Sequence, residues 1–202
     1  MSKKMTPRNN PLADPEFQHL IQLLAVDLCG AEFVERGYQR YLNEYGEGNR
    51  ARNGRIFELL IVESLQRAKI GPVYFQTEFQ FVPNVAFDIL LYHPVMPVVI
   101  SCKTSLRERY KQAELEGFVL RQVYRRAQVF LITRNVPEGM SVQKKIEQKQ
   151  LVGINECIIL NREFPDFPQN YDHVLENLSD VNFRIAEPVE PLLKVGYVFP
   201  IR

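Results

Sequence analysis

The sequence predicts an α/β fold in which a mixed central β-sheet is flanked by helices. Apolar residues recur at helical spacing through the first third of the chain, as they do where one helix face is buried. Three short runs rich in β-forming residues follow, over residues 73–81, 87–92 and 97–103. Helical and strand-like segments then alternate to about residue 160, which is typical of parallel strands joined by crossover helices.

The first predicted elements are helices. From Glu16 to about residue 44 apolar residues repeat every three or four positions, and Gly30 is expected to separate two helices. Asp14, or the loop before it, is placed to cap the first of them. Residues 47–71 predict a third, amphipathic helix that ends at Gly71-Pro72, because proline cannot continue a helix.

The middle of the chain predicts a meander of three strands, punctuated by Pro83 and by His93-Pro94. Beyond it we expect, in order, a helix over about residues 106–126, a strand over 128–133, a helix over 142–151 and a strand over 156–160. The order of elements is therefore α-β-β-β-α-β-α-β.

A chain of 202 residues is expected to form one domain, because it can bury a single core. Within that domain we expect a mobile arm, N-terminal helices, a core and an irregular wrap that is rich in proline from Glu187 to Pro200. Their predicted bounds are 1–14 for the arm, 15–48 for the N-terminal helices, 50–160 for the core and 161–202 for the wrap.

Composition limits the environment and the chemistry. A formal net charge of +1 gives no global positive field, so any basic surface must be local. The three cysteines, Cys29, Cys102 and Cys157, lie far apart without zinc-ligand spacing and predict neither a zinc site nor a disulfide framework. The sequence shows no signal-peptide core and no apolar run long enough to span a bilayer, so we expect a soluble cytoplasmic protein.

Candidate catalytic residues come from the second and third strands of the meander. Hydrolysis of a phosphodiester needs a divalent cation held by oxygen ligands, and a positive charge beside the attacking water. Asp88 lies in one predicted strand, and Lys103 ends the next. Because side chains alternate across a sheet, Ser101 and Lys103 share a face while Cys102 points into the core. If the two strands pair as a hairpin, Asp88 and Lys103 meet at one edge of the sheet.

This pattern resembles the PD-(D/E)XK nucleases, which carry an aspartate on one strand and an acid-x-lysine on the next. Here the residues at the acid-x-lysine positions are Ser101-Cys102-Lys103, so the acid is absent, and the residue before Asp88 is not a proline. One branch of type II restriction enzymes is similar in having serine there and the acid on the following helix. Glu116 stands thirteen residues after Lys103 and is the candidate for that acid.

The resemblance implies a restriction-endonuclease-like core and a dependence on Mg²⁺. Asp88 and Glu116 would hold the metal. Lys103 would position and activate the attacking water. Ser101 would occupy the motif position at which other members of the superfamily have an acid. Glu114 is a competitor for the role of Glu116, although Glu116 lies four residues after Gln112 on the same helical face.

A second part of the resemblance is the cluster Arg107-Glu108-Arg109, which stands where this branch of enzymes reads C·G pairs. Arginine can donate twice to guanine, and glutamate can accept from cytosine, so these side chains suit a GC-containing site independently of the family. The resemblance implies a target with CC and GG halves. The alternative is that the cluster is a solvated start of a helix.

Two upstream residues complete the set of candidates. Glu58 lies in the stretch 54–58, which looks like the first core helix of the superfamily, whose glutamate often approaches the metal site. Arg50 is expected to contact DNA phosphates together with Arg52 and Arg55, and a solvated helix lead-in is the alternative.

The predicted function is a type II restriction endonuclease that cleaves double-stranded DNA and leaves 5′-phosphate ends. We expect a homodimer, because two-fold symmetry places one active site on each strand of a palindromic target. A cognate DNA methyltransferase is expected in the same system. The rival hypotheses are a structure-specific or nonspecific repair nuclease of the same superfamily and a catalytically inactive DNA-binding module, which the serine at position 101 would explain.

Overall fold

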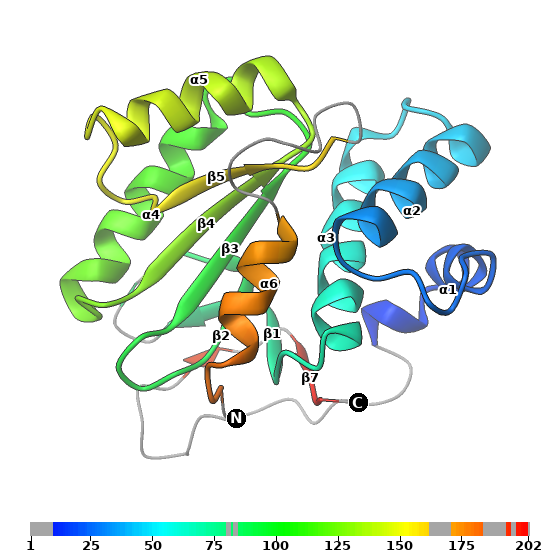
Figure 1. Cartoon of the computed structure of the whole chain (residues 1–202), viewed down its shortest axis with the longest axis horizontal. Helices are drawn as coiled ribbons and strands as arrows, with labels where there is room; N and C mark the ends of the chain where they lie inside the picture. The colour runs from blue at the N-terminus through cyan, green and yellow to red at the C-terminus, as the bar shows by residue number, and fades with distance from the viewer. Residues whose placement is uncertain are drawn as a thin grey trace.

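A computed structural model describes residues 10–79, 82, 85–161, 171–183, 193–194 and 197–201 of the chain. The described helices are α1 (Pro15–Gln22), α2 (Gly30–Tyr45), α3 (Arg50–Arg67), α4 (Arg109–Val123), α5 (Val136–Glu147) and α6 (Tyr171–Ser179), preceded by the short 3₁₀ helix η2 (Pro11–Ala13) (Figure 1). The described strands are β1 (Val73–Phe79), β2 (Phe87–Leu91), β3 (Val98–Lys103), β4 (Gln128–Thr133), β5 (Glu156–Ile159), β6 (Leu193–Lys194) and β7 (Tyr197–Phe199).

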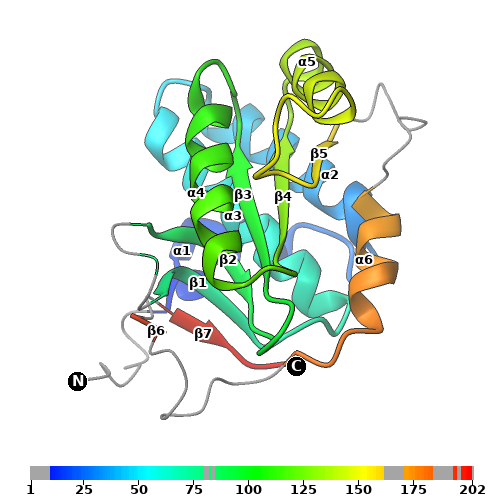
Figure 2. The ribbon, with the colours of Figure 1, turned by 90° about the vertical axis from the view of Figure 1, so that its left-hand side faces the viewer.

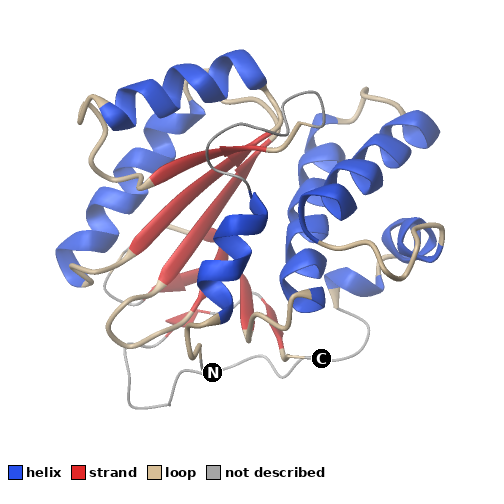
Figure 3. Ribbon diagram, in the orientation of Figure 1, coloured by secondary structure: helices blue, strands red, loops and turns tan. Residues whose placement is uncertain are grey.

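The sheet is mixed, as the sequence predicts (Figure 3). Its strands follow the order β5-β4-β3-β2-β1-β6, and β7 also pairs with β1. β1, β2 and β3 form the expected antiparallel meander. β3, β4 and β5 run parallel, because the crossover helices α4 and α5 return the chain to the same edge before each new strand.

Helices cover both faces of the sheet. Figure 1 shows α4 and α5 on one side and α2, α3 and α6 on the other, and in the perpendicular view of Figure 2 α4 lies in front of the sheet with α3 behind it. Alternate residues of the central strands pack toward opposite layers: Val99 belongs to the cluster that includes Leu120 of α4, whereas Ile100 belongs to the cluster that includes Phe57 of α3. The predicted α/β architecture is confirmed at this level.

The N-terminal helices and the order of the core elements agree with the prediction. Residues 23–29 separate α1 from α2, and Gly30 opens α2 with a φ of 56° that suits glycine. Asp14 caps α1 by accepting hydrogen bonds from the amides of Glu16 and Phe17. None of the described helices is long and apolar enough to cross a membrane.

Two predicted helices begin elsewhere. α4 starts at Arg109 rather than Leu106, because Arg107 has a φ of 35° that a right-handed helix cannot contain. α5 starts at Val136 rather than Val142, because the Asn135 side chain accepts from the Glu138 amide and caps the helix there. The prediction for α5 was based on the charged residues after position 142 and overlooked Asn135 as a helix cap.

Both predicted irregular ends were wrong in part. Residues 1–9 of the expected mobile arm lie outside the described residues, but Leu12 is buried and residues 11–13 form a 3₁₀ helix. The predicted irregular wrap contains the helix α6, whose Val174 and Leu178 enter the core, and the strands β6 and β7 that extend the sheet beside β1. These segments are ordered because their apolar side chains are buried in the core and because β6 and β7 pair with the otherwise open edge of β1. Proline content alone did not predict this.

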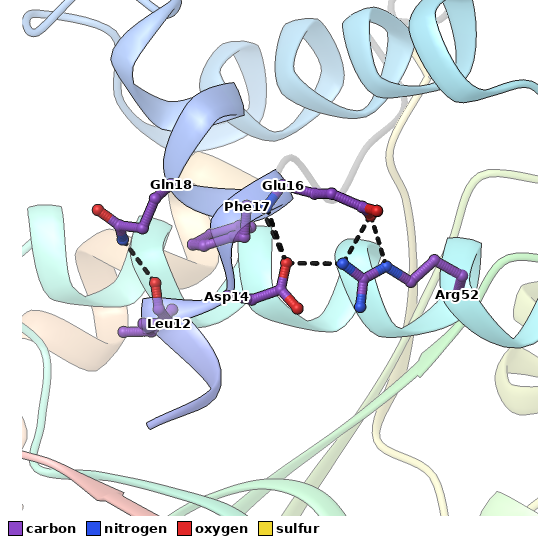
Figure 4. A network of polar contacts seen from close by, with 6 residues as sticks. All are labelled: Leu12, Asp14, Glu16, Phe17, Gln18 and Arg52. Atoms are coloured by element: carbon purple, nitrogen blue, oxygen red, sulfur yellow. Dashed lines mark hydrogen bonds and ion pairs between the residues drawn. The ribbon is translucent and has the colours of Figure 1, made fainter. Parts of the chain in front are cut away.

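Arg52 ties η2 and α1 to α3 (Figure 4). Its guanidinium donates to Asp14 at 2.6 Å, and to Glu16 at 2.9 Å from Nε and 2.6 Å from Nη2. The Asp14 carboxylate therefore serves two purposes, since it also caps α1. Arg52 therefore has a structural role, in addition to the phosphate contact expected from the sequence.

We expect Arg52→Met to lower the free energy of unfolding by about 1–2 kcal/mol, because two partly buried carboxylates lose their cationic partner. The measurement is chemical denaturation followed by circular dichroism. Arg50→Met, two residues earlier on the same helix and exposed, is the matched control and should leave stability unchanged within about 0.5 kcal/mol. Equal effects of the two substitutions would contradict a structural role for Arg52.

Candidate functional site

Asp88 and Lys103 meet at one edge of the sheet. The Lys103 ammonium donates to Asp88 Oδ2 at 2.6 Å, and the two side chains are only 15% and 13% exposed. The same oxygen accepts from the Cys102 amide at 2.9 Å and from the Ser101 hydroxyl at 3.4 Å. The predicted meeting of these residues, with Cys102 packed in the core on the opposite face, is confirmed.

The register of the meander produces this contact. β2 pairs with β3 antiparallel, with Ile89 opposite Ile100, so continuation of the same register places Asp88 opposite Ser101. Lys103 lies two residues further along β3 and therefore on the same face as Ser101. A serine at position 101 leaves room for Asp88, and its hydroxyl supports the carboxylate.

Glu58 joins the site from α3, which packs against β1, β2 and β3. Its carboxylate accepts a hydrogen bond from Gln76 at 3.1 Å and lies 3.8 Å from Arg55. Regular alternation would direct Gln76 to the face of Tyr74, away from α3. A φ of 51° in the middle of β1 breaks that alternation, and Gln76 reaches Glu58 instead. Such strained residues persist where the surrounding structure enforces them, and they are frequent at functional sites.

Glu116 approaches from α4. Gln112 donates to its carboxylate at 2.7 Å, as expected for residues four apart on one helical face. Burial raises the pKa of Glu116, while the Lys103 charge lowers it and the Asp88 charge raises it, so Glu116 is near enough to both to interact with them electrostatically.

Glu114 has a different, structural role. Its two carboxylate oxygens accept from the amides of Val152 at 2.7 Å, Gly153 at 2.9 Å and Ile154 at 3.2 Å. These bonds hold the loop before β5 against α4. The carboxylate is thus already satisfied by the protein, so between the two glutamates the geometry favours Glu116 as the catalytic candidate.

Burial and mutual charge shift the titration of this cluster. Burial raises the pKa of Glu58 to about 7, and the Asp88 charge adds to the effect while Lys103 opposes it. Burial also raises the pKa of Glu116. For Lys103 burial favours the neutral amine, but the adjacent Asp88 carboxylate outweighs burial and the pKa of Lys103 is raised. Lys103 is therefore a fixed positive charge at neutral pH.

The donor set suits a hard divalent cation. The three hydrogen bonds of Asp88 all go to Oδ2, which leaves Oδ1 for another partner. Among the described residues no group of three or more acidic, histidine or cysteine side chains is gathered closely enough to hold a metal by itself. Mg²⁺ commonly uses one or two carboxylates and completes its shell with water and phosphate oxygens, so Asp88 and Glu116 are the carboxylates that could take part in holding it.

The loop after β3 carries the three predicted base-reading residues. Arg107, Glu108 and Arg109 are all exposed, and the Glu108 carboxylate pairs with Lys111. The loop is anchored one residue earlier, where the buried Leu106 donates its amide to Glu138 of α5 at 2.6 Å. The three residues thus run from the position after this anchored residue to the first residue of α4, which is Arg109.

The arginines in the first turns of α3 separate into different roles. Arg50 is exposed and lines a cavity together with Arg107 and Arg109. Arg55 lies over the Phe75 ring at 4.2 Å and beside Glu58, so it is a half-buried neighbour of the candidate site. Of the three arginines expected to contact phosphates, Arg50 is the most exposed.

Sequence reasoning missed Gln76 and Glu138. Gln76 could have been noticed as the polar residue opposite Asp88 in the meander, but its departure from strand geometry has no sequence signal. Glu138 is an acid in the first turn of α5, three residues after the Asn135 cap. An earlier start for that helix would have drawn attention to it.

Comparison of the chain with models of known protein families, with curated proteins and with solved structures gives no match. The interpretation of the site therefore depends on its own geometry.

The raised pKa of Glu58 predicts a pH-dependent stability of the metal-free protein. A carboxyl with a folded-state pKa above its unfolded value stabilises the fold at low pH, and this contribution is lost as pH rises through about 7. We expect wild type to lose up to about 3 kcal/mol of unfolding free energy relative to Glu58→Gln between roughly pH 5 and 8. The measurement is urea denaturation across that range in EDTA. Parallel pH profiles for the two proteins would refute the assignment.

Proposed function

We propose that the chain is a type II restriction endonuclease that hydrolyses double-stranded DNA at a short GC-containing palindromic site in the presence of Mg²⁺. The observation that carries the proposal is the Asp88–Lys103 contact at 2.6 Å, with Glu58 and Glu116 in the same charged cluster. A carboxylate and an ammonium held together at a sheet edge, with further carboxylates at hand, suit phosphodiester hydrolysis.

Asp88 Oδ1 and the Glu116 carboxylate would hold Mg²⁺, which when bound supplies positive charge to stabilise the phosphate as it is attacked. The Lys103 ammonium favours removal of a proton from a neighbouring water molecule and orients that water for attack on phosphorus. Ser101 and the Cys102 amide keep Asp88 in place through their hydrogen bonds. The products are a 5′-phosphate and a 3′-hydroxyl.

Sequence preference would come from the anchored loop. Arg107 can donate twice to the O6 and N7 atoms of guanine, and Glu108 can accept from cytosine N4. Arg107 and Arg109 are two residues apart at a helix start, so they point in different directions and reach different base pairs. Fixing the loop through Glu138 reduces the entropy lost when these side chains order on DNA.

A homodimer is part of the proposal, because cutting both strands of a palindrome calls for two sites related by symmetry. Large apolar side chains stand exposed on and beside α4, among them Leu115 at 64%, Phe118 at 47% and Val152 at 55% exposure. Gly153 packs against the backbone of α4, so these side chains belong to one region of the surface. A second copy of the chain is the proposed occupant, and a cognate methyltransferase would protect the host's own sites.

Lys103→Ala should abolish cleavage and leave DNA binding intact, because the ammonium acts on water rather than on the bases. The test is digestion of a plasmid of known sequence with Mg²⁺, where discrete fragments indicate site-specific cleavage. A smear would indicate a nonspecific nuclease, and bound but intact DNA would indicate a binding module. We expect a loss of about 10²-fold or more. Lys144→Ala, an exposed lysine on α5, is the matched control.

The two glutamates of α4 give a second, internally controlled prediction. Glu116→Gln should be as inactive as Asp88→Asn, because an amide is a poorer ligand for Mg²⁺ than a carboxylate. Glu114→Gln should keep its activity, since an amide oxygen can still accept from the loop amides, and its cost should appear in thermal stability instead. Cleavage rates at saturating Mg²⁺ and melting temperatures are measured for all three variants. An active Glu116→Gln with an inactive Glu114→Gln would reverse the assignment.

A further inference from the structure

Arg134 is an arginine held in a fixed orientation directly beside the catalytic edge. It follows β4, whose last residue Thr133 pairs with Lys103 in the parallel ladder. Its Nε and Nη2 donate to the two oxygens of Glu35 at 3.1 and 3.2 Å. Its guanidinium lies 4.6 Å over the centre of the Tyr38 ring. Two interactions from α2 thus restrain a side chain that on an open surface would be mobile.

This arrangement leaves part of the guanidinium for a ligand. A bidentate contact through Nε and Nη2 uses one edge of the group, and Nη1 carries two further donors. Within the described part of the chain no hydrogen bond from Nη1 is found. Because the orientation is already fixed by Glu35 and Tyr38, little side-chain entropy would be lost when an anion binds.

Arg134 opens onto a cavity of about 380 Å³ that has the character of an anion site. Three further arginines line it, Arg50, Arg107 and Arg109, and so do the hydroxyls of Thr104 and Ser105, which directly follow Lys103. The remaining lining residues are Tyr38, Leu42, Glu47 and Asn53. Glu47 is thus the one acidic residue of the lining, against four arginines.

The buried side of the cavity also has unused polar capacity. Asn53 is 6% exposed, and its carbonyl oxygen has no hydrogen-bond partner among the described residues. Its amide nitrogen makes a single long contact of 3.5 Å with the Gly46 carbonyl. A carbonyl oxygen accepts hydrogen bonds and cannot bind a phosphodiester oxygen, so Nδ2, with its one long contact, is the part of Asn53 that could donate to an anion in the cavity.

We propose that this cavity binds one phosphodiester group of the DNA backbone, with Arg134 as its preorganised ligand and Arg50 at its rim. The proposal rests on the proposed function only in taking DNA as the substrate. Arg107 and Arg109 lie at the same cavity, so a phosphate fixed there would set the register in which they meet the bases. Phosphate contacts position a protein on the duplex without reading sequence.

The test is equilibrium binding of fluorescent duplexes in EDTA, at several salt concentrations between 50 and 200 mM, for wild type and Arg134→Gln. One duplex contains CC and GG halves and a second lacks them. We expect Arg134→Gln to weaken binding to both about tenfold. The slope of log affinity against log salt should fall by about 0.9, as for the loss of one phosphate contact. Arg107→Ala, by contrast, should change the preference between the duplexes.

Arg126→Gln is the matched control. It replaces an exposed arginine just before β4, at the opposite end of the strand from Arg134, and should leave both affinity and slope unchanged. Because Arg134 also pairs with Glu35, Arg134→Lys is a second variant that retains the charge. It should keep the salt slope while losing several-fold in affinity, since lysine cannot reproduce the fixed fork.

Three outcomes would overturn the inference. If folded Arg134→Gln and Arg134→Lys bind DNA with unchanged affinity, Arg134 does not contact a phosphate. That result alone would leave the proposed DNA cleavage standing. A changed preference between duplexes with an unchanged slope makes Arg134 a base reader. If inorganic phosphate raises the melting temperature of wild type but not of Arg134→Gln, and neither protein binds duplex DNA, the cavity serves a small phosphorylated ligand. In that last case the proposed nuclease function fails as well.

Discussion

The contact between Asp88 and Lys103 is the constraint on which the candidate site at this edge of the sheet depends. Two charges that are mostly removed from water must be paired, because an uncompensated buried charge is far more costly than the pair. The pair can form only if β2 and β3 keep one register, since a shift by a single residue would send one of the two side chains to the opposite face. The antiparallel hairpin and the charge pair therefore stabilise each other, and the surrounding helices supply the remaining carboxylates to a fixed centre.

The core of this arrangement could be predicted from the sequence. Alternation and short apolar runs are local signals, and they located the meander, the strand over 128–133 and the order of helices and strands correctly. The meeting of Asp88 with Lys103 followed from hairpin pairing alone. The choice of Glu116 over Glu114 followed from helical spacing, and the three backbone amides that engage Glu114 support it independently.

What could not be predicted depends on contacts between distant parts of the chain. Arg134 resembles any arginine after a strand until α2 brings Glu35 and Tyr38 to it. Arg52 looks like a member of a basic cluster until Asp14 and Glu16 fold back on α3. The order of the C-terminal segment has the same origin, because β7 is a strand by virtue of its pairing with β1. In each case the partner lies more than thirty residues away, beyond the reach of local pattern.

The close approach of α4 to the loop before β5 has a consequence for the position of Glu116. A methyl group added at Gly117 would lie 2.2 Å from the Gly153 carbonyl oxygen, and one added at Gly153 would lie 2.0 Å from the Glu114 carbonyl oxygen. Two backbones therefore touch at this point, and neither can rotate or slide without a collision. Glu116 is the residue next to Gly117, so this steric contact fixes the backbone from which its side chain extends. The position of a candidate metal ligand is here set by the absence of two side chains.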